Sequence, residues 1–194
     1  MTNRRDFLRN LSLMAAGSLL AGKASAAGKP ANSVMSETAT ASKSLGLQIY
    51  SLQQELYNDL PARMKELKAM GYDRLELAGY SKGKIGKVDM MEFKKMAEDA
   101  GLKIVSSHVN PAIEGVPFLR DYTKELTPKI MEYWKATAAD HAKLGCKYLI
   151  QPMMPNIPDH DAAKLVCDIF NQASDVIKAE GIATGFGYHN HNME

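Results

Sequence analysis

Cysteine, tryptophan and long apolar runs are scarce in this sequence. Its 194 residues include 2 cysteines and 1 tryptophan, and aromatic residues account for 7% of the chain. Two cysteines allow at most one disulfide, which excludes a disulfide-rich scaffold, and the spacing of Cys146 and Cys167 does not match a metal clip. We therefore expect two buried free thiols.

Basic runs are missing from most of the chain. The formal net charge is +2, but residues 1–26 carry four basic residues against one acidic residue, so the rest holds 20 Lys+Arg against 21 Asp+Glu. Nucleic-acid binding is driven by clustered lysine and arginine, which this near-neutral body lacks. The composition therefore argues against a nucleic-acid partner.

Residues 1–26 have the pattern of a twin-arginine-type signal peptide. Asn3-Arg4-Arg5-Asp6-Phe7-Leu8-Arg9 precedes an apolar stretch over 11–21, and Ala24-Ser25-Ala26 is a small-residue cleavage site. The apolar stretch is too short to span a bilayer comfortably, although an uncleaved anchor or a chance leader stays open. We expect a periplasmic protein without a stable membrane anchor, whose residues 27–44 form a disordered linker.

From residue 45 onward, strand-like and helix-like patterns alternate. The segments read as strand are 45–52, 74–80, 103–110, 147–153 and 183–192, and those read as helix are 60–70, 90–100, 127–144 and 161–180. Each helical pattern ends at a glycine. Such alternation predicts an α/β fold with a parallel sheet. No glycine-rich phosphate loop follows the first strand, which disfavours a dinucleotide-binding sheet and favours a (β/α)₈ TIM barrel.

A full barrel needs more residues than follow the leader in this sequence. A (β/α)₈ barrel takes about 250 residues, whereas about 168 residues follow the leader. We expect residues 45–194 to form five βα units of a partial barrel. The fifth strand would then be an open edge, through which the chain could self-associate.

Four polar residues interrupt the apolar strand patterns. They are Gln48, Glu76, His108 and Gln151. Burying such groups costs free energy unless they are paired or bind a ligand. Glu76 lies between two leucines, so its carboxylate must meet a cation, a metal or a hydrogen-bond donor. For Glu76 and for His108 a purely structural hydrogen bond is the alternative.

The last stretch is the most informative one. If 183–192 is a strand, Phe186 and Tyr188 share one face while His189 and His191 share the other, at the carboxyl end where barrel enzymes hold their active sites. Two imidazoles converging there are candidate metal ligands, with Glu194 nearby. A structural role for the pair stays open. His141 and His160, elsewhere in the chain, are expected to be solvated or capping.

Several segments together resemble a known superfamily. They are Leu45-Gly46-Leu47-Gln48-Ile49-Tyr50-Ser51, Met70-Gly71-Tyr72, Leu75-Glu76-Leu77-Ala78-Gly79-Tyr80, Ser107-His108-Val109, Leu144-Gly145-Cys146-Lys147-Tyr148 and Gly187-Tyr188-His189-Asn190-His191. Residues 45–194 resemble the sugar phosphate isomerase/epimerase superfamily of xylose isomerase-like TIM barrels, cut after strand five. The Tyr-His-Asn-His run is the most specific part.

The resemblance implies a divalent metal, Mn, Mg, Co or Zn, at the carboxyl end of the barrel. Typical members place a Glu on about the fifth strand and Asp, His and Glu on later strands. This sequence instead has His189-Asn190-His191, more like the inosose dehydratase branch, and strands six to eight are absent. With this departure from the family pattern, His189 and His191 are the metal candidates, with substrate contact as the alternative, and Gln48, Gln151 and Asn190 are the substrate-binding candidates.

The expected function is metal-assisted enediolate chemistry on a sugar, glycoside or cyclitol, by isomerisation, epimerisation, dehydration or keto-glycoside elimination. Glu76 and His108 are the catalytic candidates. The alternative is a catalytically inactive fragment or a carbohydrate-binding protein that keeps half of the site. A zinc phosphodiesterase of the endonuclease IV type is a distant third.

Overall fold

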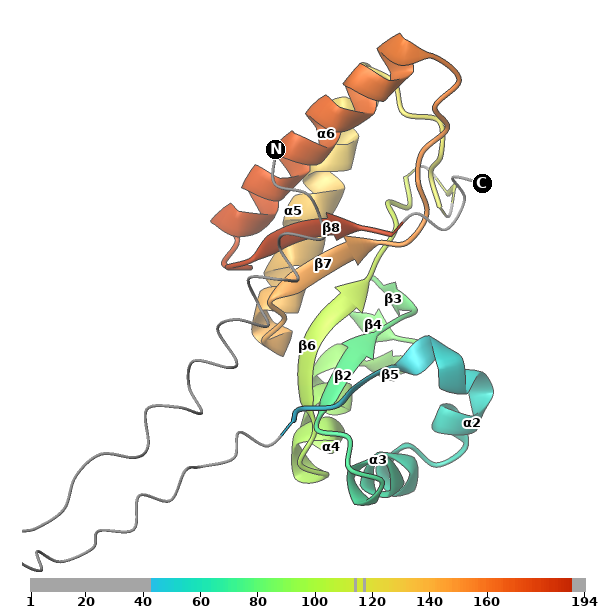
Figure 1. Cartoon of the computed structure of the whole chain (residues 1–194), viewed down its shortest axis with the longest axis vertical. Coiled ribbons are helices and arrows are strands. Elements are labelled where there is room, and N and C mark those ends of the chain that lie inside the picture. The colour runs from blue at the N-terminus through green and yellow to red at the C-terminus, as the bar shows by residue number, and fades with distance from the viewer. Residues whose placement is uncertain (1–42, 114, 117, 190–194) are drawn as a thin grey trace, which may run out of the picture. The chain divides into compact units, whose positions relative to one another are not determined.

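The computed structural model describes residues 43–113, 115–116 and 118–189, and strands and helices alternate along them (Figure 1). The elements are β1 (Gly46–Gln48), the 3₁₀ helix η1 (Ile49–Leu52), α2 (Gln53–Asn58), α3 (Leu60–Ala69), β2 (Arg74–Leu77), β3 (Tyr80–Ser81), β4 (Lys84–Ile85), β5 (Val88–Asp89), α4 (Met90–Asp99), β6 (Lys103–His108), α5 (Thr127–Leu144), β7 (Tyr148–Gln151), α6 (His160–Ala179) and β8 (Gly185–Tyr188).

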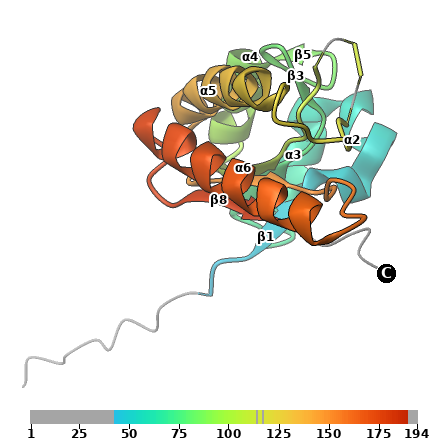
Figure 2. The same ribbon diagram turned by 90° about the horizontal axis from the view of Figure 1, so that it is seen from above.

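Five strands form one parallel sheet in the order β1-β2-β6-β7-β8. Each main strand pairs with the next one along the chain, and the helices α3 to α6 follow the same order outside the strands (Figures 1 and 2). This winding in a single direction is that of a barrel, since a doubly wound sheet reverses its strand order. The sheet does not close within the described residues, so the predicted partial barrel is confirmed.

The core lies between the sheet and these helices. Leu75 and Leu77 of β2 and Leu149 of β7 are at most 1% exposed, and they pack with Phe93 of α4 and Trp134 of α5. Burying each such side chain contributes about 1.5–3 kcal/mol. Because side chains alternate along a strand, residues next to these leucines in sequence point to the other face of the sheet, the barrel interior.

Three acidic residues begin helices as the sequence pattern requires. Asp59, Asp89 and Asp159 each accept main-chain N–H bonds in the first turn of α3, α4 and α6. Helix α5 ends at Gly145, whose φ of 84° is left-handed and therefore favours glycine. The four predicted helices are confirmed, each within one residue of its predicted start.

One local prediction is wrong, and one small sheet was not predicted. Residues 49–52 are not strand but the 3₁₀ helix η1, in which the Ser51 hydroxyl donates to the Gln48 carbonyl, and the unpredicted α2 follows. Residues 80–89 form a small antiparallel sheet, β3-β4-β5, that the sequence analysis did not predict. Its strands are two residues long, too short for periodicity to show.

The predicted aromatic face of the last strand is confirmed. Phe186 of β8 packs edge-on against Trp134 of α5 and Phe170 of α6, at ring-centroid distances of 5.2 and 4.9 Å. Tyr188, two residues on, lies 5.7 Å from the Phe170 ring. The opposite face of β8, with Gly187 and then His189, therefore turns to the barrel interior.

Two burial predictions are corrected. Both cysteines are free, but only Cys146 is buried, because Cys167 lies on the outer surface of α6. His141, expected to be solvated or capping, is completely buried against the Tyr80 ring. It shares the buried stripe of α5 with Trp134 and Ala138, which lie seven and three residues earlier in the helix. His160 is exposed, as expected.

The leader 1–26, most of the linker 27–44, and Asn190, His191 and Glu194 lie outside the described residues. At the linker's end, the Ser44 hydroxyl donates to the Asp73 carboxylate at 2.6 and 2.7 Å, which fastens the entry to β1. Within the described part of the chain, no helix is both long and apolar enough to cross a membrane.

Candidate functional site

Three of the predicted polar residues form one hydrogen-bonded chain at the carboxyl end of the sheet. Gln48 Nε2 lies 2.9 Å from His108 Nδ1, and His108 Nε2 lies 3.1 Å from Glu76 Oε1. The second carboxylate oxygen of Glu76 accepts a 2.6 Å bond from the Ser106 hydroxyl. Strands β1, β2 and β6 are neighbours in parallel register, so their inward-facing polar residues meet.

The hydrogen bonds assign the protons. The Gln48 NH₂ group can only donate, so Nδ1 of a neutral His108 accepts and the ring proton sits on Nε2, which donates to Glu76. The bond from His108, followed by that from Ser106, holds the pKa of Glu76 below its ordinary value of 4.5, against the raising effect of burial. Glu76 is therefore ionised at neutral pH and fixes the His108 ring.

These side chains border a cavity of about 690 Å³, within the range typical of ligand pockets. Gln48, His108 and His189 line it from the sheet, and Glu76 lies behind His108 rather than in the wall. The ring centroids of His108 and His189 are 5.8 Å apart. The structure thus brings together the candidates from the first, third and fifth strands of the sheet.

Gln151 is not part of this cavity. It is completely buried, its side-chain oxygen accepts from the Tyr122 hydroxyl at 3.0 Å, and its NH₂ group donates to the Met153 carbonyl at 2.8 Å. Strand alternation places Gln151 on the same face as Leu149, toward the helices. In this conformation the Gln151 side chain therefore bonds to protein groups and does not make the predicted contact with substrate.

The described residues do not complete a metal site. No group of three or more His, Cys, Asp or Glu side chains suited to a metal occurs in residues 43–189 apart from 114 and 117. Both carboxylate oxygens of Glu76 and both ring nitrogens of His108 already bond to protein groups. The predicted ligand pair His189 and His191, and the substrate candidate Asn190, stay predictions because two of these residues lie outside the described chain.

Several cavity residues were missed by the sequence analysis. Tyr80, Ser81 and Lys82 come from the β3–β4 hairpin, Tyr133 from α5, and Asn110 from the loop after β6. The available signal was Lys82-Gly83, a two-residue turn of the kind that joins hairpin strands. Asn110 follows the predicted strand end by two residues, where barrel loops carry functional groups.

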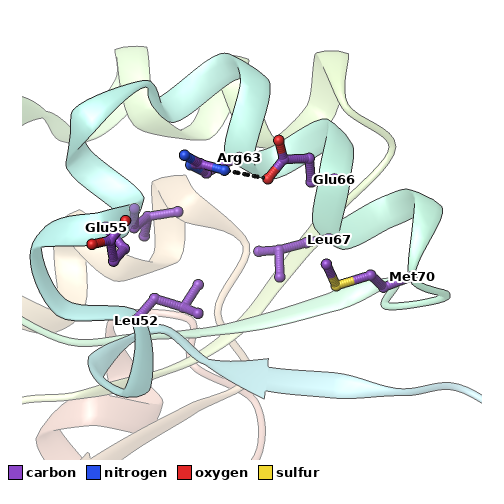
Figure 3. A pocket seen from close by; sticks show the side chains of 7 residues that line it. Leu52, Glu55, Arg63, Glu66, Leu67 and Met70 are labelled. Atoms are coloured by element: carbon purple, nitrogen blue, oxygen red, sulfur yellow. Dashed lines mark hydrogen bonds and ion pairs between the residues drawn. The ribbon is translucent and has the colours of Figure 1, made fainter.

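A second cavity, of about 190 Å³, lies between α2 and α3 (Figure 3). Leu52 and Leu67 project into it, and the Arg63 guanidinium donates to Glu66 at 2.7 Å along its rim. That ion pair is largely solvent-exposed and joins neighbours on one helix, which is an ordinary surface arrangement. The larger cavity, with its converging imidazoles and amide, is the candidate site.

Comparison with known proteins identifies the family. No family model and no curated protein matches the chain. Two solved structures, each described as a sugar phosphate isomerase/epimerase from Parabacteroides distasonis ATCC 8503, match 78% of it, at 73% identity with a TM-score of 0.75 and at 44% identity with a TM-score of 0.68. A D-psicose 3-epimerase from Clostridium cellulolyticum H10, solved with D-tagatose, shares the fold at 15% identity and a TM-score of 0.52 over 73% of the chain.

The fold and the interior polar chain define a partial barrel of the xylose isomerase-like type. The chain belongs to the sugar phosphate isomerase/epimerase superfamily. It spans 56% and 52% of the two Parabacteroides proteins, and half of the psicose epimerase.

Proposed function

We propose that the cavity binds a sugar-like molecule with a carbonyl group and that His108 moves the proton on the carbon beside it. The observation that carries this proposal is the chain from Gln48 through His108 to Glu76, with His108 in the cavity wall. An imidazole oriented by a partly buried carboxylate is a common arrangement for a general base. Superfamily membership supports isomerase or epimerase chemistry as the class.

In the proposed reaction, His108 Nδ1 takes the proton from the carbon. The bonding electrons form a carbon–carbon double bond, and the carbonyl oxygen becomes an enolate oxygen. The Gln48 NH₂ group, released from Nδ1, donates to that oxygen and stabilises its charge. Glu76 accepts the hydrogen bond from Nε2–H throughout, without taking the proton, and stabilises the imidazolium, so it is a positioning residue. If the proton returns to the former carbonyl carbon, the hydroxyl proton of the first carbon passes to the enolate oxygen, a new carbonyl forms there and the sugar is isomerised. If the enolate turns its other face to His108 and the proton returns to the first carbon, that carbon is epimerised.

The divalent metal is a separate part of the proposal. The superfamily resemblance supports Mn, Mg, Co or Zn with His189 and His191 as ligands, and no step above passes through it. Metal analysis of the purified chain beside His189→Ala and His191→Ala tests this. Stoichiometric metal that both variants lose is the expected result, and equal metal content in all three proteins would contradict it.

Deuterium exchange tests the proton transfer. The chain is incubated in D₂O with ketoses and keto-glycosides, and ¹H NMR follows loss of the signal beside the carbonyl. We expect exchange that falls by about 100-fold or more in His108→Asn, and by less in Glu76→Gln, which keeps an acceptor for the ring. Binding without exchange would instead support the alternative, a carbohydrate-binding protein without turnover. Retained exchange in His108→Asn would overturn the assigned base.

Export by the twin-arginine route to the periplasm is also proposed, from the sequence of residues 1–26. The test variant replaces both Arg4 and Arg5 by lysine, because this change keeps the charge and removes the guanidinium pair. Fractionation of cells that express each form should find the variant retained in the cytoplasm. An unchanged periplasmic fraction would argue against this route.

A further inference from the structure

The hairpin β3–β4 adds one charged side chain to the candidate cavity. Among the described residues that line this cavity, Lys82 is the only lysine, arginine, aspartate or glutamate. No described carboxylate forms an ion pair with it. The cavity therefore has a cation at its wall that forms no ion pair with a carboxylate of the described residues.

The backbone at Lys82 is unusual. Lys82 and Gly83 have φ values of 45° and 79°, so both central residues of the two-residue turn are left-handed, as in a type I′ hairpin. Asn, Asp or Gly is preferred at the first of these positions, and lysine is disfavoured there. Phe118, with φ of 59°, is the other described non-glycine residue with positive φ, and it lines the same cavity.

Hydrogen bonds on both sides hold the hairpin, which fixes the backbone position of Lys82. The Gly83 carbonyl accepts from Met90 N at 2.9 Å, and the Tyr80 hydroxyl donates to Asp140 at 2.6 Å. Asp140 is itself bonded to Lys143 at 3.1 Å, so its charge is shared with another lysine. The geometry of this anchored turn would favour Asn, Asp or Gly at the position of Lys82. The presence of lysine there therefore points to a role for its side chain.

From this arrangement we propose that Lys82 selects a sugar acid, whose carboxylate it binds while the carbonyl end of the same molecule faces His108 and Gln48. The proposal rests on the proposed function, because it assigns the substrate class of that cavity. Ser81, next to Lys82, adds a hydroxyl to the cavity wall. Asn110, which also lines the cavity, accepts a 3.2 Å hydrogen bond from Met153 N–H through Oδ1, so its NH₂ group is not used in that bond.

A carboxylate fits this wall better than a phosphate ester. A carboxylate carries one negative charge, which one ammonium group balances, whereas a phosphate ester carries about two at neutral pH and has three oxygens to satisfy. Phosphate sites are typically built from several main-chain N–H groups of a glycine-rich loop or a helix start, together with a cation. Lys82 and the neutral hydroxyl and amide groups near it provide fewer donors than a phosphate site typically has.

Calorimetric titration of the full chain tests the proposal with three probes: D-glucuronate, D-glucose 6-phosphate and neutral D-glucose. The wild-type protein should bind glucuronate about fivefold more tightly than glucose, the usual size of one partly exposed charge contact. In Lys82→Asn this ratio should fall to about one. Asparagine suits the turn, so the melting temperature should be unchanged or higher, which separates loss of the cation from misfolding. Lys84→Gln removes a charge from the same hairpin outside the cavity and should keep the wild-type ratio.

Each outcome decides a different point. A glucuronate preference that survives in Lys82→Asn, or equal affinity of the wild type for glucuronate and glucose, overturns the role of Lys82 and leaves the sugar cavity intact. Tighter binding of glucose 6-phosphate than of glucuronate overturns the assignment to carboxylates. Absence of binding by all three probes overturns the inference and the proposed function together.

Discussion

His141 is the buried residue with the clearest consequence for pH dependence. Its ring packs against Tyr80 and donates through Nδ1 to the Thr137 carbonyl at 2.7 Å, and burial lowers its pKa from 6.5 to about 4. The folded protein therefore keeps this ring neutral over a range in which the unfolded chain takes up a proton. Stability from His141 is complete above pH 6.5 and is lost as the pH falls toward 4.

We predict that His141→Gln flattens the stability profile between pH 7 and pH 5. In the wild type this residue makes the free energy of unfolding fall by up to about 1.4 kcal/mol per pH unit below 6.5, and glutamine does not titrate. Urea unfolding at pH 7, 6 and 5 measures the effect. The exposed His160→Gln should keep the wild-type slope, and parallel profiles for His141→Gln and the wild type would contradict the assignment.

At the same scale, strand alternation explains which of the predicted site residues face the barrel interior and which one faces the helices. Glu76 lies between Leu75 and Leu77, which face the helices, so its carboxylate faces inward. Gln151 lies two residues after Leu149, and the same rule turns it outward to Tyr122. The direction in which each of these two side chains points could be deduced from the sequence. What it could not show is the partner of each group, because Tyr122 and His108 come from distant segments.

At the scale of elements, the β3-β4-β5 sheet depends on a close contact with α2. Gly86, with φ of 61°, lies so near the Tyr57 ring that an added Cβ would stand 2.8 Å from two ring carbons. Gly86 lies in the turn between β4 and β5, and its N–H donates to the Gly79 carbonyl just before β3 at 2.9 Å. Neither this contact nor α2 itself has a periodic signature, because α2 is six residues long and the contact joins segments about 30 residues apart.

We predict that Gly86→Ala lowers the free energy of unfolding by about 2–3 kcal/mol, from left-handed backbone strain together with displacement of the Tyr57 ring. Gly71→Ala is the matched control, since Gly71 has φ of 99° and nothing within 4 Å of an added Cβ. It should cost about 1–2 kcal/mol, from backbone strain alone. Urea unfolding compares the two. In a Tyr57→Ala background the cost of Gly86→Ala should fall to that of Gly71→Ala, and an undiminished cost would exclude the ring contact as its cause.

For the whole molecule, the order of helices and strands and the barrel-type winding were predictable from the sequence. Long amphipathic helices that end at glycine alternate with apolar strands, and neighbouring strands of such units pair in chain order. The cavity was not predictable, because its walls come together from the carboxyl ends of several strands, a hairpin, a loop and α5. Self-association through an edge strand stays a prediction that sedimentation equilibrium can test.

The two thiols report on unfolding of the molecule as a whole. Cys146 is 5% exposed at the end of α5, and burial raises the pKa of its thiol to about 12, whereas Cys167 is exposed on α6. Thiolate is the reactive form, so a disulfide reagent at pH 8 should titrate one thiol per chain rapidly. The second should react only as urea unfolds the protein, with the same midpoint as the loss of helical circular dichroism. Cys167→Ser should remove the fast phase alone. Reaction of Cys146 well before that midpoint would mean that the sheet near β7 opens separately from the rest of the barrel.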